Sequence, residues 1–251
     1  MATIGPGRGL AALGLALALV VGACGGASPT SKPVVSPGGS GGGGDGGGTS
    51  LTYGLYSNLD RLTSYRFTWT IAGSSSGTQA SPGNSGSSTS SGVVINKPTR
   101  AIIVTSSDIW YIQIGAQEWT SLDGIDWIVF DADETVLSAT LPSQSYATWF
   151  DAHRNGFKVA GEESKNGVQC VHYRGDSSLS GLYQGLTGVS SGFQADLWVA
   201  RDGNYPVSGV YGFPGEANAQ AASFSFSFDI DKINDPSNKI TAPTSVIAVP
   251  T

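Results

Sequence analysis

Three serine stretches and two histidines are the residues whose types and spacing could support hydrolysis by a serine nucleophile. Residues 38–42, 73–77 and 188–192 each match the pattern G-x-S-x-G. In hydrolases that use this pattern, the serine lies at a sharp turn after a strand and before a helix, and a histidine activates it. None of the three stretches follows an expected strand and opens an expected helix. We therefore interpret His153 and His172 as structural, and predict no catalytic residue and no enzyme activity.

A group of oxygen-bearing side chains near the C-terminus could, by type, bind calcium. It comprises Asp229, Asp231, Asn234 and Asp235. The spacing lacks the central glycine and the closing glutamate of an EF-hand loop, so we prefer a solvent-exposed strand end. No metal and no cofactor is expected. The formal net charge is −6 with no basic cluster, which argues against nucleic acid as a partner.

Cys24 is the residue to which the sequence assigns a chemical modification. It follows the small residues Gly22 and Ala23, at the end of an apolar run over residues 10–21. A run of roughly a dozen residues suits a signal peptide and is shorter than the ~18 to 20 that span a bilayer. The junction resembles the lipobox of bacterial lipoproteins, which implies that residues 1–23 are removed and that Cys24 is lipidated. An ordinary secretory signal with an incidental cysteine and an uncleaved anchor are the alternatives.

Residues 24–50 are expected to be a disordered tether between the lipid and a folded domain. Residues 25–50 contain 11 glycines in 26 positions, mostly beside serine, proline and threonine. Such a segment buries too little apolar surface to offset the entropy of ordering it. If Cys24 carries lipid, Cys170 has no disulfide partner, and we expect it to be a buried, unreactive thiol.

Residues 51–251 are expected to form one domain of the α+β class. Leucines at positions 51, 55, 59 and 62 share one face of an expected helix, and residues 65–71 alternate as a strand. Residues 73–92 are expected to be a long loop. Further strands are expected at residues 92–96, 100–105, 108–114, 118–120, 126–130, 157–163, 168–173, 192–200, 205–213 and 223–230. A tail of Pro, Thr and Val follows them.

A second amphipathic helix is expected over residues 142–156, with an aromatic stripe that includes Phe150. A glycine-loosened leucine segment follows near residues 179–186, where each glycine weakens a helix by about 1 kcal/mol. The order of helix, strands, helix and strands contains no βαβ alternation. It predicts a large curved antiparallel sheet, or half-barrel, with helices covering the concave face.

Several strand and turn patterns together resemble a known family. They are Asp108-Ile109-Trp110-Tyr111, Glu118-Trp119, Gly161-Glu162, Asn166-Gly167-Val168-Gln169-Cys170-Val171-His172-Tyr173 and Asp196-Leu197-Trp198-Val199-Ala200-Arg201-Asp202-Gly203-Asn204-Tyr205-Pro206-Val207. With the leucine helix before an aromatic strand, they are similar to LolA-like bacterial lipoproteins of the LppX/LprG type. The resemblance implies a half-barrel around an apolar cavity that binds lipid or lipoglycan acyl chains for envelope lipid transport. It carries no catalytic residue.

The candidate site consists of apolar side chains. We predict that the cavity wall is formed by Trp69, Phe150, Phe224, Phe226 and Phe228, and the lid by Leu179, Leu182 and Leu186. Aromatic faces of this kind can also pack on each other as an ordinary core, and that alternative stays open for each residue taken singly. For the set as a whole, the family resemblance favours a cavity.

Two functions from different classes follow from the sequence. The first is a lipoprotein held in the cell membrane by its N-terminal lipid, on the extracytoplasmic face. It would bind a lipid or glycolipid ligand and meet a transport partner protein. The second is an envelope sensor or protein-interaction module on the same fold, without lipid carriage. An open cavity would favour the first, and a collapsed core with an exposed apolar patch would favour the second.

Overall fold

The computed structural model describes residues 51–74, 85–106, 109–131, 150, 154–175, 179, 194–213 and 223–247. The chain divides into two compact units, residues 1–46 and 47–251, and every described residue belongs to the second. The predicted signal peptide, Cys24 and the whole predicted tether lie outside the described residues. No helix within the described ranges is long and apolar enough to cross a membrane.

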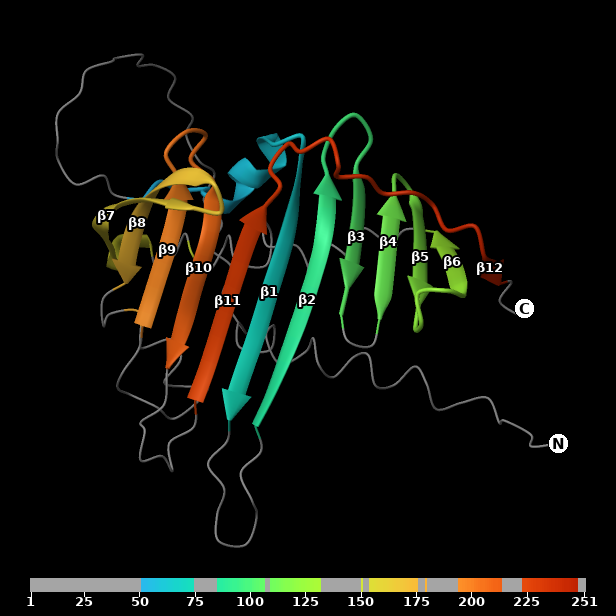
Figure 1. The fold of residues 1–251 in the computed structure, drawn as a ribbon, viewed down its shortest axis with the longest axis horizontal. Helices are drawn as coiled ribbons and strands as arrows, with labels where there is room; N and C mark the ends of the chain where they lie inside the picture. The colour runs from blue at the N-terminus through green and yellow to red at the C-terminus, as the bar shows by residue number, and fades with distance from the viewer. Residues whose placement is uncertain are drawn as a thin grey trace, which may run out of the picture. The chain divides into compact units, whose positions relative to one another are not determined.

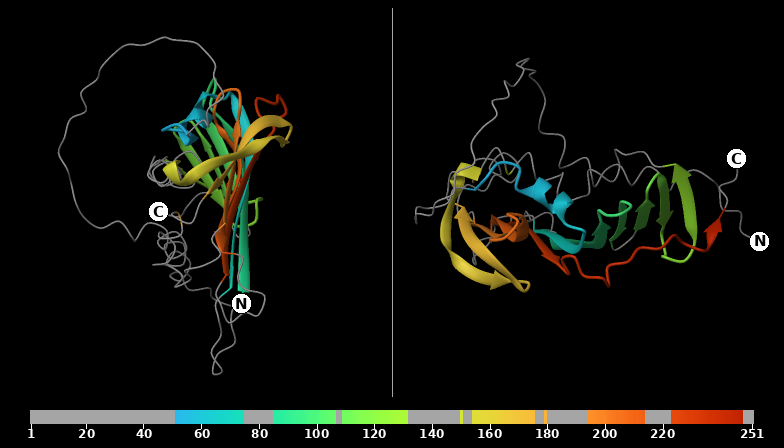
Figure 2. Two further views of the ribbon diagram at one scale, coloured as in Figure 1. Left: turned by 90° about the vertical axis from the view of Figure 1, so that its left-hand side faces the viewer. Right: turned by 90° about the horizontal axis from the view of Figure 1, so that it is seen from above.

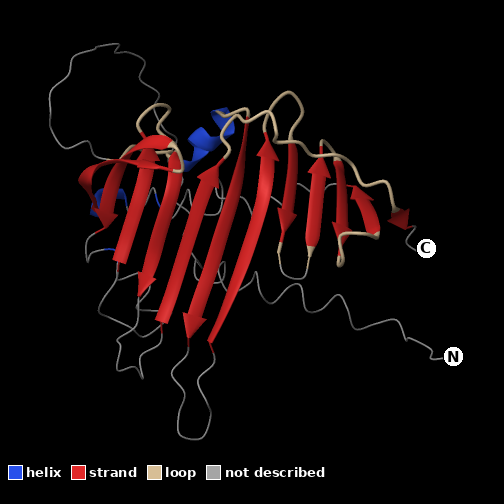
Figure 3. Ribbon diagram, viewed as in Figure 1, coloured by secondary structure: helices blue, strands red, loops and turns tan. Residues whose placement is uncertain are grey.

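The described residues form one sheet of twelve strands (Figures 1 and 3). The strands are β1 Ser64–Ser74, β2 Ser85–Ile95, β3 Ala101–Thr105, β4 Trp110–Ile114, β5 Gln117–Ser121, β6 Trp127–Asp131, β7 Phe157–Lys165, β8 Val168–Gly175, β9 Gln194–Ala200, β10 Pro206–Phe213, β11 Ser223–Asp231 and β12 Val246–Ile247. Their spatial order is β12-β6-β5-β4-β3-β2-β1-β11-β10-β9-β8-β7. All neighbours are antiparallel except β12, which pairs with β6 in parallel.

The predicted α+β class, with helices covering the concave face, is wrong for the described residues. Apart from the single helical residues Phe150 and Leu179, they contain two short 3₁₀ helices, η1 Tyr56–Arg61 and η2 Arg154–Gly156. The expected helix from residue 51 is interrupted because Gly54 adopts φ 73°, a left-handed conformation that an α-helix excludes. The expected helix over residues 142–156 lies outside the described residues except for Phe150 and η2.

One further expectation about the sheet was wrong, and the sheet contains one strand beyond those expected. Part of the expected loop at residues 73–92 belongs to β2, which pairs with β1 from Ser64 opposite Ile95 to Ser74 opposite Ser85. Serine and glycine give β2 no apolar alternation to recognise, so its pairing with β1 and β3 defines it as a strand. The C-terminal tail also contributes β12 to the edge of the sheet.

The two faces of the sheet differ in composition. The face that carries Tyr65, Phe67 and Trp69 of β1 is called the inner face, and the face that carries Arg66 and Thr68 is called the outer face. Figure 2 shows η1 against one face and the segment between β11 and β12 along the opposite face. Tyr65 and Phe67 are buried in one cluster with the leucines of the η1 region, so η1 packs against part of the inner face.

The segment between β11 and β12 is fixed by amide side chains. Asn234 Oδ1 accepts hydrogen bonds from the backbone N–H of Thr63 (2.7 Å) and Ser64 (3.3 Å). Asn238 Nδ2 donates to Ser64 Oγ at 2.9 Å, and Arg66 Nε donates to Asn238 Oδ1 at 3.1 Å. These contacts hold the segment against the start of β1, from which it reaches the far edge of the sheet.

Candidate functional site

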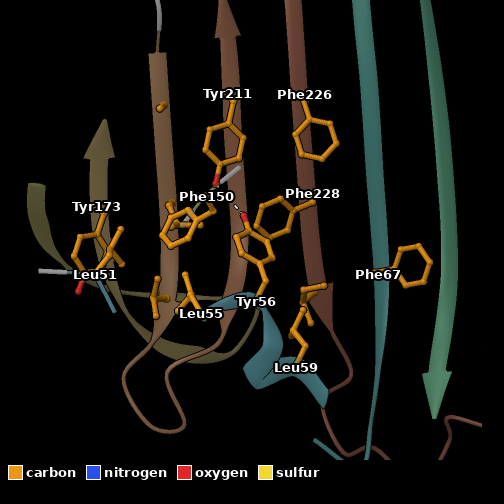
Figure 4. Close-up of a cluster of buried hydrophobic side chains, with 14 of the residues drawn as sticks. Leu51, Leu55, Tyr56, Leu59, Phe67, Phe150, Tyr173, Tyr211, Phe226 and Phe228 are labelled. Atoms are coloured by element: carbon orange, nitrogen blue, oxygen red, sulfur yellow. Dashed lines mark hydrogen bonds between the residues drawn. The ribbon is translucent and has the colours of Figure 1, made fainter. Parts of the chain in front are cut away.

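The centre of the inner face is a cluster of aromatic side chains beneath η1 (Figure 4). Tyr56 of η1 is 1% exposed and contacts Phe150 edge to face, with ring centroids 5.4 Å apart. Its ring also lies 5.8 Å from that of Phe228. The hydroxyl of Tyr56 is 3.2 Å from the hydroxyl of Tyr211 on β10. This buried hydrogen bond fixes how the Tyr56 ring of η1 lies against the Tyr211 ring of β10.

The cluster continues across three strands as a row of rings. Tyr211 and Phe226 are stacked with centroids 6.2 Å apart, and Phe226 lies 6.3 Å from Phe228. Trp69 of β1 meets Phe226 edge to face at 5.9 Å. Antiparallel register produces this row, because Trp69 pairs with Phe228 and Phe226 pairs with Tyr211. Each such pair contributes about 0.5–1.5 kcal/mol beyond its buried area.

Of the five predicted wall residues, four are brought together here. Phe150, Phe226 and Phe228 belong to the buried cluster, and Trp69 packs against it while remaining partly exposed. Phe224 lies in β11 on the same face by register, opposite Gly73, and its side chain is outside the description. Whether these residues line a cavity stays a prediction.

Of the three predicted lid residues, only Leu179 is described. It is 1% exposed, and its Cδ1 lies over Gly175 of β8, where a Cβ would be only 2.5 Å away. The absence of a side chain at Gly175 therefore lets Leu179 pack directly on the sheet. Leu182 and Leu186 lie outside the described residues, and their lid role remains a prediction.

Beside the buried cluster, the inner face carries a partly exposed apolar strip, which we call the inner strip. It consists of Trp69 and Ile71 on β1, Ser88 and Ser90 on β2, Val104 on β3 and Tyr111 on β4. The four apolar members pack against the cluster and are only partly buried. The β2 residues between them are small, and none of the six is charged. The strip is therefore an accessible apolar surface that continues from the core.

Sequence reasoning missed Tyr56, Tyr211, Val104 and Tyr111 as members of this region. Tyr56 was overlooked because the leucine spacing was interpreted as α-helical. In the 3₁₀ helix the three-residue spacing of Tyr56, Leu59 and Leu62 brings these side chains to the same face. Tyr211 lies two residues after Gly209 in β10, and alternation along that strand would have marked it as an inner-face residue.

The residues that suggested hydrolysis do not form a hydrolytic site in the described part of the chain. His172 lies on β8, with Nδ1 3.2 Å from Glu163 Oε1 and Nε2 2.7 Å from Asp196 Oδ1. Its ring is stacked on Trp198 at 4.5 Å. His153 and the serines at 38–42, 75–77 and 188–192 lie outside the described residues.

Two of the four C-terminal residues that could by type bind calcium make hydrogen bonds within the protein. Asp235 Oδ1 accepts the backbone N–H of Ser237 at 2.8 Å, and Asn234 holds the start of β1 as described above. Within the described ranges, no three His, Cys, Asp or Glu side chains are grouped as metal ligands. Cys170 is a buried free thiol, as expected, and desolvation raises its pKa, which lowers its reactivity at neutral pH.

No family model matches the sequence, and no curated protein matches it. Among solved structures, the chain is similar to lipoprotein LppX of Mycobacterium tuberculosis, with 16% identity, 74% of this chain and 93% of that chain covered, and a TM-score of 0.42. It is similar to LprF of Mycobacterium bovis, with 11% identity, coverage of 75% and 93%, and a TM-score of 0.41. A LolA-superfamily protein of Nitrosomonas europaea gives 8% identity, coverage of 70% and 90%, and a TM-score of 0.24. The structural neighbours thus include the LolA-like and LppX-type proteins that the sequence was predicted to resemble.

Proposed function

We propose that this chain is an extracytoplasmic lipoprotein, anchored by lipid on Cys24, that binds lipid acyl chains on the inner face for envelope lipid transport. The observation that carries the proposal is the inner strip. It presents Trp69, Ile71, Val104 and Tyr111 partly exposed beside a large buried aromatic cluster. Exposed apolar surface that continues from a core is typical of sites for apolar ligands.

The chemistry of the inner strip suits an alkyl chain. It contains no charged side chain, so an uncharged chain leaves no ion unpaired when it displaces water. The strip crosses from β1 to β4, which is three strand spacings or about 14 Å. That span is comparable with the length of a fatty acyl chain. Each methylene that leaves water contributes about 0.8 kcal/mol, which is enough for stable binding without a charged contact.

A direct test uses the full chain, purified from a bacterial envelope and transferred from detergent into amphipol. The probe is a long-chain fatty acid methyl ester with pyrene at the end of its chain, which has an acyl chain and no charged head group. Binding is followed by quenching of tryptophan fluorescence. We expect saturable binding that Ile71→Asp weakens at least tenfold, because the new carboxylate lies in the inner strip.

Thr70→Asp is the matched control, since Thr70 is the preceding residue of β1 on the outer face and makes a hydrogen bond with Thr89 (3.0 Å). The control is expected to bind the probe within twofold of the unchanged protein. No binding by the unchanged protein, or equal loss in the two variants, would reject the proposal.

A second candidate, a protein-interaction module, is favoured by the turn between β5 and β6. Leu122 and Ile125 on this turn are 75% and 69% exposed. Asp123 Oδ1 accepts the backbone N–H of Ile125 at 2.8 Å and of Asp126 at 3.0 Å, so the turn is held in one conformation. Two exposed aliphatic side chains on a fixed turn suit insertion into an apolar pocket of a partner protein.

This candidate is tested by placing a photo-crosslinking amino acid at position 122 or 125 in cells and, as a control, at Val210, which is 41% exposed on the outer face. A crosslinked protein seen from the turn positions and not from position 210 supports interaction through the turn. Equal crosslinking from all three positions argues against it.

A further inference from the structure

Glu118 on β5 is a buried carboxylate in an unusual position. Glu118 is 5% exposed, and its Oε1 atom has no hydrogen-bond partner. The neighbouring residue Trp119 packs in an outer-face cluster with Ile112, and because side chains alternate along a strand, Glu118 projects to the inner face. The carboxylate therefore lies on the same face as the inner strip.

The neighbours of Glu118 on the sheet do not satisfy it. Gln113 is directly opposite on β4 and could donate from its amide. Its Nε2 instead donates to the carbonyl oxygen of Gly115 at 3.3 Å. Within the described part of the chain, no Lys, Arg or His forms an ion pair with Glu118. Oε1 of Glu118 is thus a buried acceptor that the surrounding sheet leaves unused.

A buried carboxylate oxygen without a hydrogen-bond partner is costly to the fold. Removing an ion from water without a compensating hydrogen bond costs several kcal/mol, so such groups usually have a partner. A ligand can provide the partner that the protein omits. The position fits this role, since Tyr111 of the inner strip pairs with Thr120, two residues along β5 from Glu118. Tyr111 and Glu118 are therefore diagonal neighbours on paired strands, and such neighbours are about 7–8 Å apart.

We propose that Glu118 accepts hydrogen bonds from the head group of the lipid whose acyl chain occupies the inner strip. This inference rests on the proposed function and adds a ligand class to it. The ligand is an amphiphile whose head group donates hydrogen bonds, through an ammonium or through hydroxyl groups. A head group that is a free carboxylate is disfavoured, because two like charges would meet in a poorly solvated place.

The test compares four probes that share one pyrene-labelled chain and differ only in the head group: a primary amine, a monoglyceride, a methyl ester and a free acid. Binding to the full chain in amphipol is measured at neutral pH. The expected order of affinity is amine and monoglyceride above methyl ester, and methyl ester above free acid. The amine and the monoglyceride separate an ammonium donor from a hydroxyl donor.

Glu118→Gln is the decisive variant, because it keeps the size of the side chain and removes its charge. We expect it to bind the amine at least tenfold more weakly, to bind the monoglyceride only a few-fold more weakly, and to leave the methyl ester unchanged. Glu162→Gln is the control, since Glu162 is exposed on β7 and pairs with Arg201 at 3.2 Å. The control should leave all four affinities unchanged.

A second measurement separates a ligand-binding role from a structural one. If Glu118 serves the ligand, Glu118→Gln should raise the melting temperature of the ligand-free protein by a few degrees while it weakens binding of the amine. Binding of the methyl ester without discrimination among head groups, or a Glu118→Gln variant that melts lower and binds all four probes as the unchanged protein does, overturns the inference. Failure of every probe to bind rejects the proposed function itself.

Discussion

The hydroxyl groups of Tyr56 and Tyr211 lie 3.2 Å apart although 155 positions separate the two residues in the sequence. This contact joins the 3₁₀ helix that opens the domain to one of the last long strands. It lies within the aromatic cluster, beside Phe150 and Phe228. The helix is thereby positioned over the inner face by a directional bond in addition to apolar packing.

Replacing either tyrosine by phenylalanine should reduce the free energy of unfolding by about 1 kcal/mol, because a buried hydrogen bond is lost while the ring remains. In a double-mutant cycle, Tyr56→Phe with Tyr211→Phe should cost less than the sum of the two single changes. Urea unfolding followed by tryptophan fluorescence measures the loss of unfolding free energy in each single variant and in the double variant. Strict additivity would show that the two hydroxyls do not interact.

Shortening Leu59 should destabilise the domain far more than its place in a six-residue helix suggests. Leu59 is 0% exposed in the central cluster, so Leu59→Ala should cost about 2–5 kcal/mol through lost burial and a residual cavity. Arg61→Ala in the same helix, at an exposed position, is the control and should change stability by less than about 0.5 kcal/mol. Chemical denaturation of the full chain measures both values.

Two glycines of β2 make a matched pair for testing how closely the inner face is packed. A Cβ at Gly92 would lie 2.2 Å from the carbonyl oxygen of Ile103 and 2.6 Å from the ring of Phe67. A Cβ at Gly86 would meet no atom within 4 Å. We expect Gly92→Ala to cost about 1–3 kcal/mol, whereas Gly86→Ala should be neutral or slightly stabilising. Equal melting temperatures for the two variants would contradict the described packing.

The turn between β5 and β6 should give the domain a defined acid sensitivity. Hydrogen bonds from the backbone of Asp126 and Ile125, followed by one from Ser121, lower the pKa of Asp123 below its ordinary value of 3.8. A lowered folded pKa stabilises the fold above the unfolded pKa, and this contribution is lost as the pH falls through the folded value. The melting temperature should therefore fall between about pH 5 and pH 2, and less steeply in Asp123→Asn.

Asp202→Asn, at an exposed turn, serves as the control for this acid titration. It removes the same charge without removing the hydrogen bonds of the β5–β6 turn, so its acid profile should parallel that of the unchanged protein. If Asp123→Asn also parallels the unchanged protein, Asp123 contributes nothing to the acid sensitivity.

The sequence predicted those strands in which apolar and polar residues alternate, such as Phe224 to Ile230 in β11. The expected strands over residues 157–163 and 168–173 are joined by a tight turn at Asn166 and Gly167, whose φ angles of 51° and 80° are those that asparagine and glycine adopt most easily. Local chemistry determines both features, so they can be recognised from a few neighbouring residues.

The remaining features depend on partners that are distant in the sequence. β2 contains mostly serine and glycine, and only β1 and β3 on either side define it as a strand. The inner strip combines side chains from β1 to β4, so its membership follows from register and was invisible in any single segment. Glu118 was not singled out either, because a lone glutamate in a short strand has no local signal that its oxygen lacks a partner.

The pairing of β1 with β11 also sets an order of events for a chain that emerges N-terminus first. Arg66 lies opposite Asp231, so the first strand meets one of its two partners only when almost the whole domain has been delivered. Contacts that join such distant segments form slowly, because a long loop must close before they stabilise anything. The central sheet is thus a late product of folding, completed only after the C-terminal strands of the domain have emerged.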